Sequence, residues 1–180
     1  MRPLKAGFIY GIIGAVVALV SDFYFLFVDP VGTPAWMLAV IQAYHTQIAL
    51  TAFLFLGILA ALSARPAYLD PGVPYRSLLL RDCALAATIV AVMVGAVLFF
   101  ATALQATVFA SQARTYANEA APKIVDYSNT TRQDLIKGRI KRGETPQQAR
   151  KLPPPAKLEN VRGALNPPSL AALGRSIMNL

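Results

Sequence analysis

The architecture of this chain follows first from one uncharged run, AWMLAVIQAYHTQIALTAFLFLGILAALSA, which extends over residues 35–64. It contains no Asp, Glu, Lys or Arg. A helix rises about 1.5 Å per residue and the hydrocarbon core of a bilayer is about 30 Å thick, so this run is long enough to cross it. Trp36 stands at its beginning, where an aromatic side chain suits the membrane interface. The run therefore predicts a transmembrane helix.

Two further apolar runs flank the first, over residues 6–28 and from residue 82 to about residue 111. Connectors rich in proline and glycine separate the three runs, at residues 29–34 and 65–81. We therefore predict three transmembrane helices. Cationic residues precede the run over residues 6–28, as in a signal peptide, but no small-residue cleavage site ends it, so we expect this span to be retained.

The positions of the cations predict the orientation of the spans. The N-terminal segment and the second connector hold Arg2, Lys5, Arg65, Arg76 and Arg81, whereas the first connector holds none. Cytoplasmic loops carry an excess of Lys and Arg close to the span ends. We therefore expect a multi-pass integral membrane protein with a cytoplasmic N-terminus and a C-terminal tail on the opposite side.

Composition divides the chain into two parts. Its 180 residues are 56% hydrophobic with a mean hydropathy of +0.49, which is too apolar for an ordinary soluble chain. Of the 17 Lys and Arg, 12 lie after residue 110 together with five of the nine acids, so the tail carries +7 of the formal +8. We predict an all-α membrane protein with a transmembrane region over residues 1–111. Residues 112–180 should form a basic, proline-rich, extended and partly helical tail without a core of its own.

Small residues recur at helical spacing in two of the spans. The first span contains Gly7, Gly11 and Ala15, and the third contains Ala87, Ala91 and Gly95. Helices in lipid associate where small side chains let their backbones approach. We interpret both stripes as helix-packing positions, which can face other spans of this chain or the helices of another subunit.

A layer of polar residues lies inside the predicted spans. Asp22, Gln42, His45 and Gln105 fall at similar depths in the half of the bilayer nearer the tail. They can serve as interhelical hydrogen bonds, each contributing about 0.6 kcal/mol on average. They can instead form a site in which Asp22 and His45 relay a proton or hold a quinone head group. His45 can also be an axial ligand to a chlorophyll magnesium or a haem iron.

The residue inventory limits the cofactors and reactions. His45 and Cys83 are the only residues of their types, so one chain cannot supply two axial histidines, and there is no CxxCH attachment motif. We expect no cofactor to be bound by this chain alone, and any such site to be shared with a partner. No Ser/His/Asp set, Cys/His set or phosphate loop is present, which argues against an enzyme.

The tail is predicted to contact a partner protein or lipid. Its basic helical segment contains Arg132, Lys137, Arg139, Lys141 and Arg142, and Pro153, Pro154 and Pro155 follow as extended polyproline chain. A basic helix can lie on lipid head groups, and extended prolines suit a groove on a protein. Because the tail is joined to membrane spans, we expect other membrane subunits and the bilayer as partners, and no nucleic acid.

These patterns are consistent with three functions, of which the first is favoured and the other two are alternatives. The first is a non-catalytic accessory or structural subunit of a larger membrane protein complex, whose spans pack on partner helices while the tail clamps a partner surface. The second is a quinone-, chlorophyll- or haem-binding membrane subunit that uses His45. The third is a channel or transporter component formed by oligomerisation. A stand-alone transporter is disfavoured because no span has a central charge or an internal proline.

Overall fold

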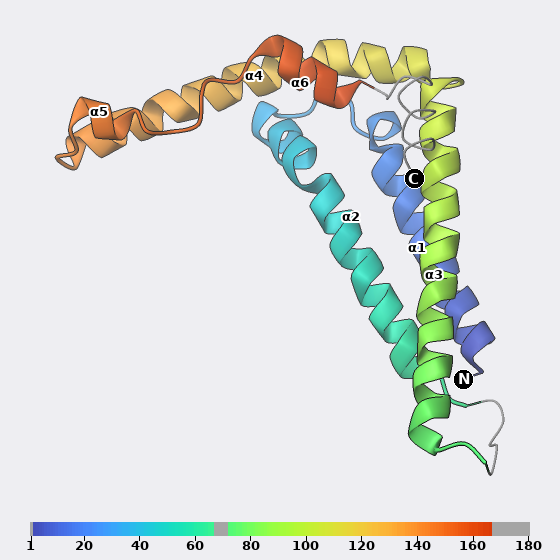
Figure 1. Cartoon of the computed structure of the whole chain (residues 1–180). Coiled ribbons are helices and arrows are strands. Elements are labelled where there is room, and N and C mark those ends of the chain that lie inside the picture. The colour runs from blue at the N-terminus through green and yellow to red at the C-terminus, as the bar shows by residue number, and fades with distance from the viewer. Residues whose placement is uncertain (1, 67–71, 167–180) are drawn as a thin grey trace, which may run out of the picture. The chain divides into compact units, whose positions relative to one another are not determined.

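The computed structural model describes residues 2–66 and 72–166, and every regular element in these ranges is a helix. The elements are α1 (Pro3–Asp22), the 3₁₀ helix η1 (Tyr24–Leu26), α2 (Ala35–Ser63), α3 (Tyr75–Ala106), α4 (Ala110–Lys141), α5 (Pro146–Ala149) and α6 (Leu158–Leu165) (Figure 1). Helices α1, α2 and α3 are long and apolar enough to cross a membrane. The predicted all-helical architecture, with three helices able to span a membrane, is thereby confirmed, and it indicates an integral membrane protein.

The span boundaries differ from the sequence prediction at both flanking helices. α1 ends at Asp22 rather than at residue 28, because the chain continues into the separate helix η1. α3 begins at Tyr75 rather than at residue 82. The carbonyl oxygen of Pro74 accepts hydrogen bonds from the N–H groups of Ser77 (2.9 Å) and Leu78 (3.3 Å), so the helix begins directly after this proline. Arg76 and Arg81 lie in its first turns and remain exposed, so their charges do not prevent the helix from forming there.

The first connector is a tight turn built around Asp29. Its carboxylate accepts hydrogen bonds from the N–H groups of Val31 (2.9 Å) and Gly32 (3.0 Å). Its backbone carbonyl accepts a third from Thr33 (3.0 Å). An aspartate that binds the backbone ahead of it in this way is typical of turns. Pro34 follows, and α2 begins with the next residue.

The chain forms two compact units. The first comprises the residues up to Tyr24 and residues 44–104, which are α1, most of α2 and nearly all of α3. The second comprises residues 25–43 and the chain from Gln105 onward. The first connector and the tail therefore belong to one unit.

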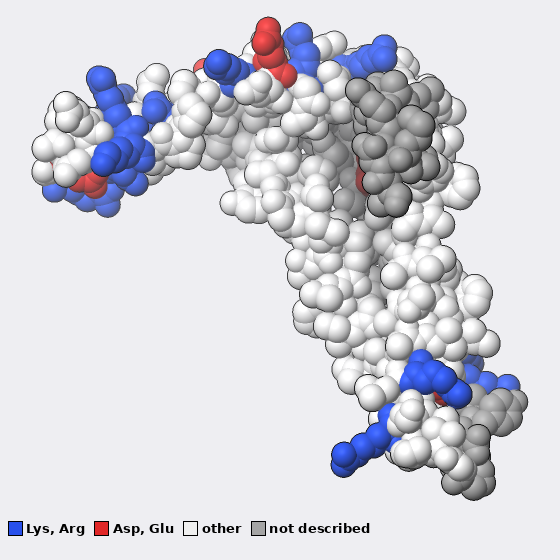
Figure 2. Space-filling model, in the orientation of Figure 1, with Lys and Arg blue, Asp and Glu red and all other residues white. Residues whose placement is uncertain are grey.

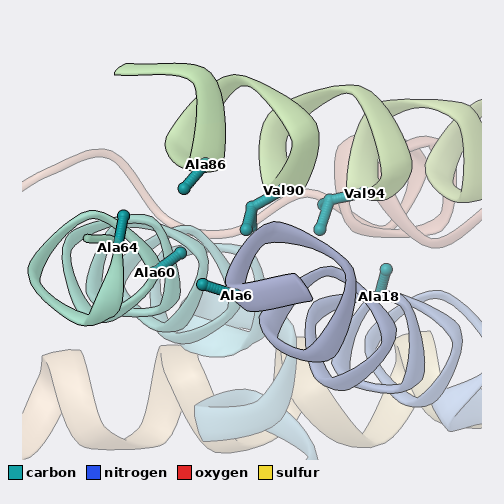
Figure 3. Packing of buried hydrophobic residues seen from close by; sticks show 7 residues of the cluster. All are labelled: Ala6, Ala18, Ala60, Ala64, Ala86, Val90 and Val94. Atoms are coloured by element: carbon teal, nitrogen blue, oxygen red, sulfur yellow. The ribbon is translucent and has the colours of Figure 1, made fainter. Parts of the chain in front are cut away.

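The core of the first unit consists of small side chains. Its buried cluster contains Ala6, Ala18, Ala60, Ala64, Ala86, Val90 and Val94. In Figure 3, the side chains that α3 contributes point toward alanines of α1 and α2. Two polar contacts add to this packing: Tyr10 Oη lies 3.2 Å from Ser63 Oγ, and Cys83 Sγ–H donates to the Ala61 carbonyl over 3.1 Å. Such a core relies on close backbone approach rather than on large apolar groups.

The glycines of α1 make that approach possible. A Cβ atom added to Gly7 would lie 2.8 Å from Ile89 Cβ and 3.0 Å from the Ala86 carbonyl oxygen, closer than side chains normally come. Gly11 and Gly14 are also buried against α3. The two predicted packing glycines of α1 therefore lie at the α1–α3 contact.

The remaining predicted packing positions lie elsewhere. Ala15 and Ala87 are half-buried, whereas Ala91 and Gly95 are exposed. A Cβ atom added to Gly95 would meet nothing within 4 Å. The face of α3 that packs inside the unit is instead the adjacent one, which carries Val90 and Val94.

Large apolar side chains cover the outside of the spans. Ile48, Leu54 and Val92 are each more than 60% exposed. Figure 2 shows an almost uncharged surface along the spans, with Lys and Arg side chains at their end near the N-terminus. Such a surface is costly in water and suits the hydrocarbon of a bilayer.

In the second unit, α4 is one continuous helix with Pro122 inside it. Its buried side chains recur every three or four residues: Ala113, Tyr116, Ala117, Ala120, Ala121 and Ile124. The Phe25 ring lies 6.5 Å from the Tyr116 ring, and Lys123 Nζ donates to the Val31 carbonyl. α4 thus contacts both η1 and the first connector within the same unit. Burial raises the pKa of Tyr116 to about 12.

The tail folds back on α4. Gly143, with φ of +90°, follows the end of α4, and α5 and α6 lie against that helix (Figure 1). Ala149 and Leu165 become buried as a result. We expected an extended, partly helical tail without a core of its own; its helices α5 and α6 pack on α4. The final residues, 167–180, lie outside the described part.

Candidate functional site

A group of polar side chains surrounds the end of α1 in the first unit. The carboxyl of Asp22, the last residue of α1, hydrogen-bonds the Thr102 hydroxyl of α3 and interacts electrostatically with His45 of α2. Thr102 Oγ1 also donates to the Leu98 carbonyl oxygen over 2.7 Å. A hydroxyl has only one hydrogen, so Thr102 donates to one of these oxygens at a time. The Thr102 hydroxyl therefore donates either to the Asp22 carboxylate or to its own helix.

His45 is held between two neighbours. Its ring centroid lies 4.9 Å from that of Tyr24, the first residue of η1, with the rings inclined by 43°. Its Nε2 atom lies 3.2 Å from the Thr46 hydroxyl oxygen. These contacts orient the imidazole beside the Asp22 carboxyl.

No family model matches this chain, and no curated protein or solved structure matches it either. Its chemistry therefore has to be inferred from the side chains themselves. A carboxyl, an imidazole, a hydroxyl and a phenol ring meet here from all three spans. Such a group can pass a proton, hydrogen-bond the polar head of a quinone, or hold the three helices together.

The four residues of the predicted polar layer belong to two different compact units. Asp22 and His45 interact electrostatically within the first unit. Gln42 and Gln105 are both half-buried and belong to the second compact unit.

Tyr24 was missed by the sequence analysis, and Thr102 was not singled out. Tyr24 stands in the aromatic run FYFLF and was taken as part of an apolar span. A tyrosine two residues after the only acid of that run is the signal that could have identified it. Thr102 offered no such signal, because threonines in spans commonly bond their own helix, as this one also does.

His45 is the residue that would ligate a pigment or haem metal. Ligation through Nε2 would replace its contact with the Thr46 hydroxyl. In residues 2–66 and 72–166, no three His, Cys, Asp or Glu side chains come together as ligands for a metal ion.

A second feature of the first unit is an apolar groove of ≈ 390 Å³ between α2 and α3. It is lined by Phe53, Leu54, Gly57, Ile58, Ala61, Ala87, Val90, Ala91 and Val94. A Cβ atom added to Gly57 would meet nothing within 4 Å. Small residues on both walls therefore leave room beside the two helices.

The basic residues predicted to contact a partner are partly engaged within the tail. Arg132 Nε donates to the Pro153 carbonyl over 2.8 Å. Lys137 lies 3.6 Å from Asp134, and Arg139 lies 3.8 Å from Glu144. Such exposed ion pairs contribute little stability. The two basic residues at the end of α4, Lys141 and Arg142, are exposed.

The proline segment lies along α4 with its side chains accessible. Pro153, Pro154 and Pro155 are all exposed. The Asn129 side chain hydrogen-bonds both backbone groups of Ala156, directly after them. The backbone of this segment is therefore fastened while its prolines remain available for contact.

Proposed function

We propose that this chain is a non-catalytic subunit of a larger membrane protein complex, with spans that pack on a partner's helix and a tail that holds a partner's surface. The observation that carries the proposal is the open groove between α2 and α3. Its lining is apolar and its walls contain Gly57, Ala61, Ala87 and Ala91. Small residues of this kind are typical of helix–helix interfaces in membranes.

The two small-residue stripes have different positions in the packed unit. The α1 stripe at Gly7 and Gly11 is used inside the unit, against α3. The α3 stripe at Ala91 and Gly95 remains exposed after the unit has packed. Small residues give no specific advantage for contact with lipid, whereas they let the backbone of a partner helix come close to the backbone of α3. This exposed stripe supports contact with another subunit.

The fastened proline segment supports the role of the tail. Asn129 and Arg132 hold the backbone of residues 153–156 by hydrogen bonds. An extended segment that is already ordered loses less entropy when it docks on a protein groove. The exposed Lys141 and Arg142 add positive charge that an acidic partner surface can pair with.

Purification in a gentle detergent tests the proposal. A tagged chain should bring down partner subunits at fixed stoichiometry, and Ala91→Leu should lower their yield by filling the groove. Ala96→Leu is the matched control, because Ala96 is also exposed on α3 but does not line the groove. A monodisperse monomer, or equal partner loss in both variants, would contradict the proposal.

The Asp22 group supports a second candidate, a quinone- or pigment-binding membrane subunit. Its support is the meeting of Asp22, His45 and Thr102 from three helices, with the Tyr24 ring inclined against the imidazole. An absorption spectrum and quinone extraction of the purified complex would detect the ligand. His45→Ala should lower ligand content at least tenfold, while Gln47→Ala, an exposed change on α2, should leave it unchanged. Unaltered ligand content in His45→Ala would exclude this candidate.

A further inference from the structure

A cleft of ≈ 430 Å³ opens in the first unit where α1 begins. Its lining includes Arg2, Leu4, Lys5, Arg81, Asp82 and Leu85. Figure 2 shows Lys and Arg side chains gathered at the end of the spans near the N-terminus, next to the uncharged surface. The cleft therefore lies at a boundary between apolar and charged surface, which is where a span leaves the membrane.

The charge of the cleft suits an anion. Arg2 and Lys5 are exposed, and Arg81 is 64% exposed in its side chain. The carboxylate of Asp82 is buried and pairs with Arg81 through Nε, at 3.0 Å. An arginine has further N–H donors beyond Nε, so this pair orients the guanidinium without using all of it. Three cations against one carboxylate leave the cleft net positive.

The apolar side of the cleft limits what kind of anion fits. Leu4 is 57% exposed and Leu85 is 42% exposed. Phe8, one turn further along the same face of α1, is 54% exposed. An inorganic phosphate or a sugar phosphate would make no favourable apolar contact with these side chains. A molecule with an anionic head and a hydrocarbon chain would use both the cations and the apolar path that leads away from them.

We propose that this cleft binds an anionic phospholipid. Arg2, Lys5 and Arg81 contact the phosphate of the head group, and Leu4 and Leu85 lie along the start of an acyl chain. Basic pockets between transmembrane helices on the cytoplasmic side bind such head groups. On the orientation that the cations predict, this end of the spans meets the cytoplasmic leaflet, where anionic lipids are concentrated. The lipid site does not depend on the proposed partner subunit.

Lipid titration of the delipidated full-length chain, followed by native mass spectrometry, tests the proposal. The probes are phosphatidylglycerol and phosphatidylcholine with identical acyl chains. The test variant is Arg2→Gln/Lys5→Gln, which keeps the Arg81–Asp82 pair intact, because removing Arg81 would leave a buried carboxylate unpaired. The matched control is Arg65→Gln/Arg76→Gln, which removes equal charge from exposed residues that do not line the cleft.

The wild-type chain should retain phosphatidylglycerol in preference to phosphatidylcholine. The test variant should bind phosphatidylglycerol about twenty-fivefold more weakly, at about fivefold for each of the two cations removed. The control should remain within about twofold of wild type. Equal binding of the two lipids, or equal loss in the control, would overturn the proposal. Displacement of the lipid by a tenfold excess of inorganic phosphate would overturn it in favour of a soluble anion.

Discussion

The side-chain amide of Asn129 pairs with the backbone of Ala156 at both of its polar groups. Asn129 Oδ1 accepts from the Ala156 N–H over 2.9 Å, and Nδ2 donates to the Ala156 carbonyl over 3.2 Å. The two residues are 27 positions apart in the chain. This pair, with the neighbouring bond from Arg132 to Pro153, attaches the proline segment to α4.

Replacing Asn129 by alanine should release the proline segment and α6 from α4. A hydrogen bond contributes about 0.5–1.5 kcal/mol net, so losing two should weaken the attachment by about 1–3 kcal/mol. Hydrogen exchange at residues 156–165 should then accelerate roughly tenfold to a hundredfold. Asn118→Ala, at an exposed asparagine of the same helix, is the control and should change nothing. Unaltered exchange in Asn129→Ala would show that other contacts hold the segment.

Gly7→Ala should destabilise the contact between α1 and α3. The added methyl group would lie 2.8 Å from Ile89 Cβ and 3.0 Å from a backbone oxygen, and neither atom can move without shifting the helix. Overpacking of this kind costs about 1–3 kcal/mol, which a thermal-unfolding assay in detergent should detect as a lower midpoint. Gly95→Ala adds the same methyl group in open space and should leave the midpoint unchanged or raise it. Similar midpoints for both variants would mean that α1 is not closely packed.

Tyr116 should make the second unit sensitive to alkali. Burial raises its pKa to about 12, above the value of about 10 in an unfolded chain. The stability from its neutral hydroxyl is fully present below pH 10 and is lost as the pH rises through 12. The stability of Tyr116→Phe should therefore fall less steeply with rising pH than that of wild type between pH 10 and 12, as followed by circular dichroism. Tyr127→Phe changes an exposed tyrosine of α4 and should keep the pH dependence of wild type. Equal slopes of stability against pH for the two variants would show that burial of Tyr116 is not the cause.

Pro122→Ala should strengthen α4. Proline lacks an N–H and cannot hydrogen-bond the carbonyl of Asn118, and it is up to about 3 kcal/mol less favourable than alanine within a helix. The Pro122 side chain is exposed, so its loss should leave no cavity. Amide exchange at residues 118–126 should slow in this variant, while Pro155→Ala, outside the helix, should not affect it. Faster exchange would show that the packed face of α4 requires a distortion at the proline.

Hydrophobicity determines the three spans from local sequence alone. The uncharged stretch over residues 35–64 needs no partner to prefer hydrocarbon over water, because its preference is a sum over its own side chains. The tight turn at Asp29 is equally local. Both features could therefore be predicted from the sequence. The span ends differ from the prediction because backbone conformation, rather than hydropathy, determines where a helix begins and ends.

The candidate site depended on quantities that a linear sequence does not contain. Similar depth along three helices predicted that Asp22 and His45 share a layer, but the rotation of each helix decides which side chains in that layer meet. Rotation brought Thr102 and Tyr24 into the group. It also turned the Ala91 stripe outward while an adjacent face of α3 packed.

The hydropathy of a segment is the sum over its own residues. The sequence by itself therefore determined that this protein has membrane-spanning segments. The rotational setting of α1 against α3, and the return of residues 153–156 onto Asn129, depend on contacts between distant residues. Only the folded chain decides them, because the energy of each contact exists only once both partners are in place.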